Sequence, residues 1–129
     1  MDVSKYAAIK RWLLDESMRI EKIKRPEYTI EDLDVLANFK RVGDALGVTP
    51  HVAAGIYARK HEDALARIAR NPRAETAEPV IGRFADRLNY LSLQLALLIE
   101  EGYVTLPPAY STQEPIQRDL PWEDTNGRK

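Results

Sequence analysis

Asp86 is an ionisable residue whose position in the chain places it beside apolar residues. It lies within the segment GRFADRLNY, beside a stripe of apolar residues expected on one face of a helix. Burying a carboxylate is costly unless it is paired with a cation or holds a metal ion. Spacing alone favours a partly exposed Asp86 that is bridged to Arg83 or Arg87. The alternative is a carboxylate that serves as a metal ligand.

A second concentration of ionisable residues occupies little more than one helical turn, from Arg59 to Asp63. His61 lies at its centre, next to the apolar face of the same predicted helix. A lone histidine at such a position is most often structural. Residues two apart on a helix point in different directions, so His61 and Asp63 are poor partners for one metal ion. His51, at the start of this helix, is expected at the surface.

The element that positions Asp86 is predicted to be one long helix from Ala77 to Gly102. Pro79 suits the first turn of a helix, and Gly102 suits the left-handed position that ends one. Apolar residues at alternating steps of three and four form a stripe that is expected to face the core. This stripe consists of Ile81, Phe84, Leu88, Leu91, Leu95 and Leu98.

The second half of this helix is apolar almost all the way round. A helix tolerates such a pattern only where neighbours cover most of its circumference. We therefore expect the helix to be central to the fold, or to form a dimer face along residues 91–99 that includes Leu93 and Leu97. The additional apolar residues are Leu93, Ala96, Leu97 and Ile99.

Three helices are predicted before the long one. The first runs over Val3–Lys24, because the residue before Pro26 avoids helical geometry. The second runs over Ile30–Leu46, and the third over Pro50–Arg70 with Thr49 as its cap.

Turn and cap residues mark the ends of the second helix. Thr29 and Asp32 resemble a capping box at its start, and Gly47 suits its end. Its buried side is expected to include Leu33, Leu36, Phe39, Val42 and Leu46. The face of the first helix is expected to carry Tyr6, Ile9, Leu13, Ile20 and Ile23, with Trp12 beside them.

These elements predict an all-α fold, a compact bundle of about four helices with a long central C-terminal helix. Residues 1–106 are expected to form one domain. Residues 107–129 are rich in proline and lack a helical period, so an irregular tail is expected there.

Composition excludes several classes of protein. The formal net charge is −1, which argues against broad binding to nucleic acid. The absence of cysteine excludes disulfides and thiolate sites. No stretch reads as a signal peptide or a membrane span, so a cytoplasmic protein without membrane association is expected. The sequence contains neither a glycine-rich phosphate loop nor an internal repeat.

Three segments together resemble a known family. They are LDVLANFKRVGDALGVTP, GIYARKHEDALARI and EPVIGRFADRLNYLSLQLALLIEEG. In order and spacing they are similar to the nucleotide-modification-associated domain, a small all-α family found largely in bacteriophages. That family is similar in turn to the MazG-like nucleoside triphosphate pyrophosphohydrolases. The resemblance covers about residues 30–102 and implies a protein of the host cytoplasm, if the chain is of phage origin.

The resemblance implies a helical domain that binds Mg²⁺ through carboxylates of two helices and cleaves a nucleotide between its α- and β-phosphates. Mg²⁺ takes oxygen ligands from one or two carboxylates together with phosphates. The family pattern assigns Glu78 and Asp86 to metal binding and catalysis. It places Glu31 and Asp34 as weaker metal ligands on the second helix. Gly82 stands where the family has another acid.

The same pattern implies contacts to the nucleotide. Asn89 and Tyr90 match an Asn-Tyr pair of the family. Lys60 matches a basic position, Arg83 is suited to hold a phosphate as a planar fork, and Lys40 is a further phosphate contact.

Three functions remain open at this stage. The first is a Mg²⁺-dependent nucleotide pyrophosphohydrolase of phage nucleotide metabolism. The second is a non-catalytic relative that binds or sequesters a nucleotide or a nucleotide signal, which the missing acid at Gly82 favours. The third is a helical interaction module. A homodimer or higher homo-oligomer is expected in each case.

Overall fold

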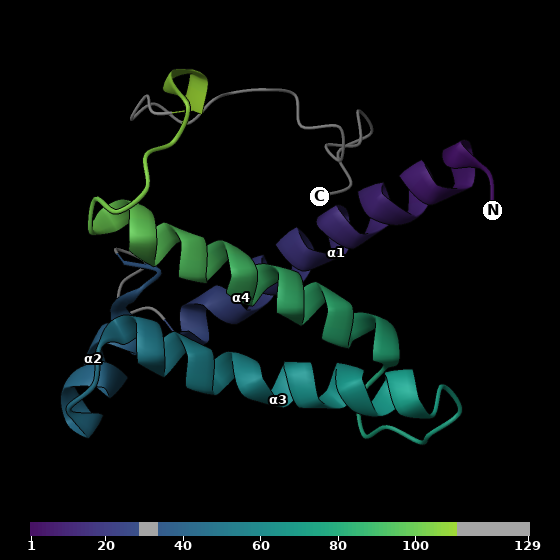
Figure 1. Ribbon diagram of the computed structural model, residues 1–129, viewed down its shortest axis with the longest axis horizontal. Helices are drawn as coiled ribbons and strands as arrows, with labels where there is room; N and C mark the ends of the chain where they lie inside the picture. Colours follow the sequence, from purple (N-terminus) through teal and green to yellow (C-terminus); the bar gives the residue numbers. More distant parts are fainter. Residues whose placement is uncertain (29–33, 111–129) are drawn as a thin grey trace.

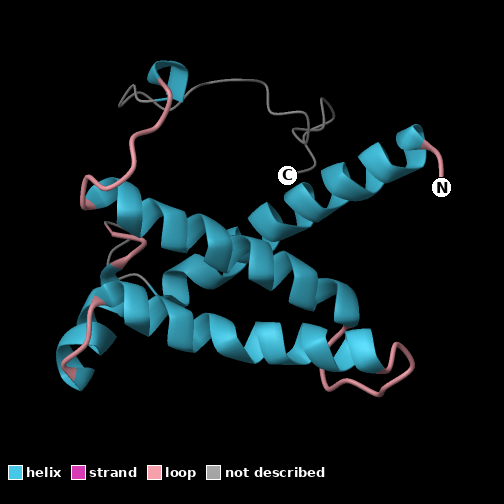
Figure 2. Cartoon of the chain, in the orientation of Figure 1, coloured by secondary structure: helices cyan, strands magenta, loops and turns pink. Residues whose placement is uncertain are grey.

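This computed structural model describes residues 1–28 and 34–110. They form four α-helices joined by loops, and they contain no strand (Figures 1 and 2). The all-α class predicted from the sequence is therefore confirmed. None of the helices in this part of the chain is long and apolar enough to cross a membrane. The helices are α1 (Val3–Tyr28), α2 (Ala37–Leu46), α3 (Pro50–Arg70) and α4 (Val80–Glu100), followed by a single 3₁₀ turn, Pro108–Tyr110.

The helices pack in the order α1, α4, α3, α2. α4 contacts α1 on one side and α3 on the other, and α2 contacts α3. Figure 1 shows α1 crossing α4 near the middle of both helices, while the N-terminal half of α1 projects away from the rest of the molecule.

The bounds of α3 agree with the prediction. The side chain of Thr49 accepts a hydrogen bond from the backbone N–H of Val52 (3.3 Å), and Pro50 occupies the first helical position. Gly47, which ends α2, has the left-handed backbone (φ 69°) expected of it. Gly102 also has a positive φ (81°) and follows α4 closely, whereas Pro79 immediately precedes that helix rather than lying in its first turn.

The end predicted for the first helix is wrong, because α1 continues through Pro26 to Tyr28. A proline inside a helix removes one backbone hydrogen bond, here the bond to the carbonyl of Lys22. Lys22 is an exposed residue, so water can replace that bond. Arg25 also forms two hydrogen bonds with Glu21 (2.8 and 2.6 Å), which hold the last turns together.

The second helix begins later than predicted, at Ala37 instead of Ile30. The carboxylate of Asp34 accepts a hydrogen bond from the backbone N–H of Leu36 (2.9 Å), and the carbonyl of Asp34 accepts one from Ala37 (3.2 Å). An aspartate that binds the backbone two residues on stabilises a turn in competition with a helix. The capping box expected at Thr29 lies outside the described residues.

The core forms where α2, α3 and α4 meet. α3 can approach α2 and α4 closely because most of the buried residues on α3 are alanines. Gly43 of α2 also has no room for a side chain, since an added Cβ would lie 2.8 Å from the carbonyl oxygen of Val48. The buried apolar cluster is Leu36, Phe39, Ala53, Ala54 and Leu97.

The apolar stripe of α4 that was expected in the core is instead largely exposed. Its members Ile81, Phe84, Leu91, Leu95 and Leu98 are between 36% and 53% exposed. The opposite face, which carries Asp86 and Leu97, packs against α3, where Leu97 forms one buried cluster with Ala53 and Ala54.

Other residues predicted to be buried also lie at the surface. Leu46 is 60% exposed, and Tyr6, Ile9 and Ile23 of α1 are exposed as well. A dimer contact through Leu97 is excluded, because this side chain is fully buried in the core of its own chain.

Two leucines that were both expected to be buried provide a test of this core. Leu97→Ala is expected to lower the free energy of unfolding by about 2–5 kcal/mol, because it opens a cavity in a fully buried site. Leu46→Ala, the same change at an exposed site, is expected to cost less than about 1 kcal/mol. Urea unfolding followed by circular dichroism at one protein concentration measures both. Equal losses for the two variants would contradict the observed core.

Candidate functional site

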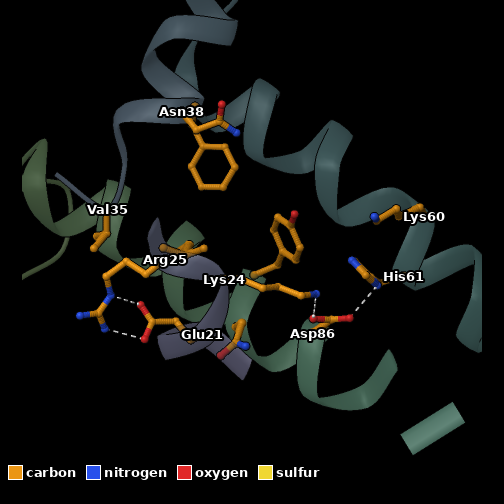
Figure 3. A pocket seen from close by; sticks show the side chains of 12 residues that line it. Glu21, Lys24, Arg25, Val35, Asn38, Lys60, His61 and Asp86 are labelled. Atoms are coloured by element: carbon orange, nitrogen blue, oxygen red, sulfur yellow. Dashed lines mark hydrogen bonds and ion pairs between the residues drawn. The ribbon is translucent and has the colours of Figure 1, made fainter. Parts of the chain in front are cut away.

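A cavity of about 100 Å³ lies where the C-terminal half of α1 meets the other three helices (Figure 3). Its walls combine charged side chains of α1, α3 and α4 with an aromatic surface from α2 and α4. The lining residues are Glu21, Lys24, Arg25, Val35, Asn38, Phe39, Lys60, His61, Asp86, Asn89, Tyr90 and Leu93.

Asp86 is buried at the edge of this cavity, with only 7% of its surface exposed. The ammonium group of Lys24 donates a hydrogen bond of 3.1 Å to one of its carboxylate oxygens. The Nδ1 atom of His61 lies 3.7 Å from the other oxygen. Figure 3 shows Asp86 between these two side chains. A cation from another helix therefore compensates the buried charge.

The predicted bridge from Asp86 to a neighbouring arginine of its own helix is wrong. Arg87 pairs with Glu62 of α3 (2.9 Å), and Arg83 pairs with Glu78 (3.5 Å). Asp86 points into the interface between helices, where Lys24 can reach it from α1.

His61 is 3% exposed, and its Nδ1 atom has no hydrogen-bond partner among the residues that the structure describes. Burial lowers the pKa of His61 below its ordinary value of 6.5. The positive charges of Lys60, Arg83 and Lys24 act in the same direction, and Asp86 opposes them. His61 is therefore neutral at pH 7, with one polar atom left unsatisfied beside a carboxylate and a cavity.

Further cations lie around the cavity. Arg25 is held by its two hydrogen bonds to Glu21. Lys60 is exposed and has no ion-pair partner within residues 1–28 and 34–110. His61 is neutral, so the described residues place three cations and two carboxylates on the cavity wall. They are Lys24, Arg25 and Lys60, and Glu21 and Asp86.

The aromatic wall consists of Phe39 and Tyr90. Their ring centroids are 6.2 Å apart and the rings are tilted by 48°, while Tyr90 also lies 5.3 Å from the ring of His61. Asn89 precedes Tyr90 and donates a hydrogen bond to the backbone carbonyl of Ser17 (2.9 Å). This bond and the Lys24–Asp86 pair both fasten α1 to α4 at the cavity.

The structure brings together four of the residues that the sequence analysis assigned to a site. Lys60, Asp86, Asn89 and Tyr90 all line the cavity. Glu78 and Arg83 do not line it, but pair with each other around the start of α4.

The remaining assigned residues lie elsewhere. Asp34 pairs with Lys40 (2.8 Å), and Lys40 also pairs with Glu100 (3.0 Å) at the C-terminal end of α4. Glu31 falls outside the described residues. Three of the expected metal ligands, Glu78, Asp86 and Asp34, therefore lie at separate places along α4 rather than around one point.

A magnesium ion would be held by carboxylates of the described residues together with phosphate oxygens. No three histidine, aspartate or glutamate side chains within the described residues converge as potential ligands. The two carboxylates that line the cavity, Glu21 and Asp86, are each paired with a cation. Arg83 is paired as well, close to the position of the absent acid at Gly82.

Sequence reasoning missed Lys24 and His61 as members of the site. The concentration of charges around His61 was visible, as was its position beside an apolar face. Nothing in the spacing pointed to Lys24, because it lies 62 residues from Asp86 in the chain.

Comparisons with models of known protein families, with curated proteins and with solved structures found no match for this chain.

The buried, neutral state of His61 predicts a pH-dependent stability. A histidine whose pKa is lowered by folding stabilises the fold above pH 6.5, and this contribution is lost as the pH falls from about 6.5 towards the folded-state pKa. The groups that face His61 are Lys60, Asp86, Arg83 and Lys24. We expect the melting temperature to fall between pH 7.5 and 5.5.

His61→Gln is the control for this prediction, since glutamine keeps an N–H donor but does not titrate. The variant should lose less in melting temperature than the wild-type protein over the same interval. His51 is present in both proteins, so the difference isolates His61. Identical losses would show that His61 is not held neutral by the fold.

Proposed function

We propose that the cavity binds a nucleotide, with the phosphates facing Lys24, Lys60 and His61 and the base facing Phe39 and Tyr90. The observation that carries this proposal is the convergence of cationic groups from two helices on one end of a cavity that has an aromatic wall. Nucleotides combine these same two chemistries, an anionic end and a flat π-surface.

The charged end of the cavity is suited to phosphate. Lys60 has no ion-pair partner within the described residues, so it can approach an anion without breaking an existing pair. The unsatisfied Nδ1 of His61, which lies 3.7 Å from a carboxylate oxygen of Asp86, becomes a donor when the ring carries a proton on that atom. Charge-assisted hydrogen bonds from such groups to phosphate are about twice as strong as neutral ones.

The aromatic end is suited to a base. Stacking of a base on an aromatic side chain is worth about 1–3 kcal/mol and tolerates any base. The side-chain amide of Asn38 also lines this part of the cavity and offers both a donor and an acceptor to a base edge. The volume of about 100 Å³ is smaller than that of a whole nucleotide, so part of the nucleotide extends out of the cavity.

Asp86 has the role of a counter-ion in this proposal. It holds Lys24 and faces His61, which positions two phosphate-binding groups. Both carboxylates in the cavity are already paired, which supports binding without turnover over hydrolysis.

Mg²⁺-dependent pyrophosphohydrolysis stays a second candidate. It is favoured by one observation, the presence of Glu21 and Asp86 from two different helices in the same cavity. A metal would have to bring phosphate oxygens of the nucleotide as ligands and displace the cation paired with each carboxylate. A phage origin, a cytoplasmic location, self-association and the central position of the long helix stay predictions alongside it.

Lys60→Gln tests the proposed phosphate contact. Loss of one charge-assisted hydrogen bond should weaken binding of deoxyribonucleoside triphosphates about tenfold or more. Lys22→Gln removes the same charge from an α1 residue that does not line the cavity, and should leave the affinity unchanged. Isothermal titration calorimetry with each nucleotide, and with pyrophosphate alone, measures both. Equal affinities in the two variants, or no binding to wild-type protein, would refute the site.

Asp86→Asn distinguishes binding from hydrolysis. If Asp86 is a counter-ion, its neutralisation removes a negative charge beside the phosphates, so nucleotide affinity without metal should be unchanged or higher. If Asp86 holds Mg²⁺, metal-dependent formation of monophosphate and pyrophosphate by the wild-type protein should be lost in the variant. Calorimetry without metal and chromatography of products with Mg²⁺ separate the two. If the wild-type protein neither binds nor hydrolyses a nucleotide, a helical interaction module is the remaining function.

A further inference from the structure

The outer face of α4 is a stripe of apolar side chains that the described part of the chain leaves about half exposed. We use this name for Ile81, Phe84, Leu91, Leu95 and Leu98, which are between 36% and 53% exposed. At 100° per residue these side chains fall within about one third of the helix circumference, opposite the face that carries Asp86 and Leu97. The outer face is therefore separate from the cavity.

A second uncovered apolar surface belongs to the projecting part of α1. We call residues 3–14 the α1 arm; none of its residues is buried, and the first buried residue of α1 is Ser17. The arm extends beyond the rest of the molecule (Figures 1 and 2). Tyr6, Ile9 and Trp12 on it are between 39% and 56% exposed. A helix of about 12 residues is marginal in water without packing.

The two surfaces together are large enough for a stable interface. Each half-exposed large side chain presents roughly 100 Å², so the eight side chains present roughly 800 Å², which is what each partner buries in a typical stable interface.

The two surfaces also match in length. Tyr6, Ile9 and the partly buried Leu13 span two turns at steps of three and four, and Leu91, Leu95 and Leu98 span two turns at steps of four and three. Such stripes pack along each other when two helices meet.

We propose that a second copy of this chain covers both surfaces, with the α1 arm of each protomer packed on the outer face of α4 of the other. A two-fold axis relates the two contacts, so each copy supplies one arm and one face, and the assembly closes as a dimer. A second copy is the occupant because one chain carries both uncovered surfaces, and this arrangement covers them together. The inference does not depend on what the cavity binds.

Light scattering of the full-length protein after size-exclusion chromatography tests the dimer. The wild-type mass should be twice 14.7 kDa. Ile9→Glu in the arm and Leu95→Glu in the outer face should each give monomers. Ile56→Glu places the same charge at an exposed isoleucine of α3, outside both surfaces, and should leave the dimer intact. A monomeric wild-type protein would overturn the proposal.

Cross-linking tests the pairing without relying on charged variants. The chain has no cysteine, so single cysteines can be introduced cleanly. A mixture of Ile9→Cys and Leu95→Cys proteins, allowed to exchange subunits and then oxidised, should form a disulfide-linked species that joins the two variants. Each variant alone should form little disulfide-linked dimer. Efficient linking of either variant to itself, with none in the mixture, would overturn the reciprocal arrangement.

Discussion

The burial of the Asp86 carboxylate between α1 and α3 is the constraint on which the rest of the structure depends. A charge in this position has to be compensated, and Lys24 from α1 provides the compensation. Together with the bond from Asn89 to the carbonyl of Ser17, this pair fastens the C-terminal half of α1 to α4. Apolar packing stops at these polar groups, which is why a cavity with charged walls lies there rather than a closed core.

The buried core of this protein is small. Within residues 1–28 and 34–110, Leu97 is the largest side chain that is completely buried, and many large apolar side chains lie outside the core. α4 therefore has two different apolar faces, one against α3 and one facing outwards. α1 is divided in a similar way, since its C-terminal half forms a wall of the cavity and its N-terminal half projects. The proposed ligand site and the proposed dimer contact thus lie on opposite faces of α4 and opposite halves of α1.

Periodicity and caps predicted those features that depend on neighbours in the chain. The bounds of α3 follow from Thr49, Pro50 and the break at Asn71, because a cap and a proline act within one turn. The end of α2 at Gly47 follows for the same reason. Asp86 was identified as an unusual residue because burying a carboxylate beside an apolar stripe costs free energy unless the charge is paired.

Only the tertiary structure decided which apolar face is buried and which cation meets Asp86. Two faces of α4 are apolar, and the choice between them depends on α3, whose small Ala53 and Ala54 form one buried cluster with Leu97. Lys24 meets Asp86 because α1 crosses α4, and no local spacing encodes that crossing. The sequence by itself therefore determined the all-α class, most of the helix ends and the residue that needs a partner. The partner, the cavity and the exposed faces are decided by contacts between residues far apart in the chain.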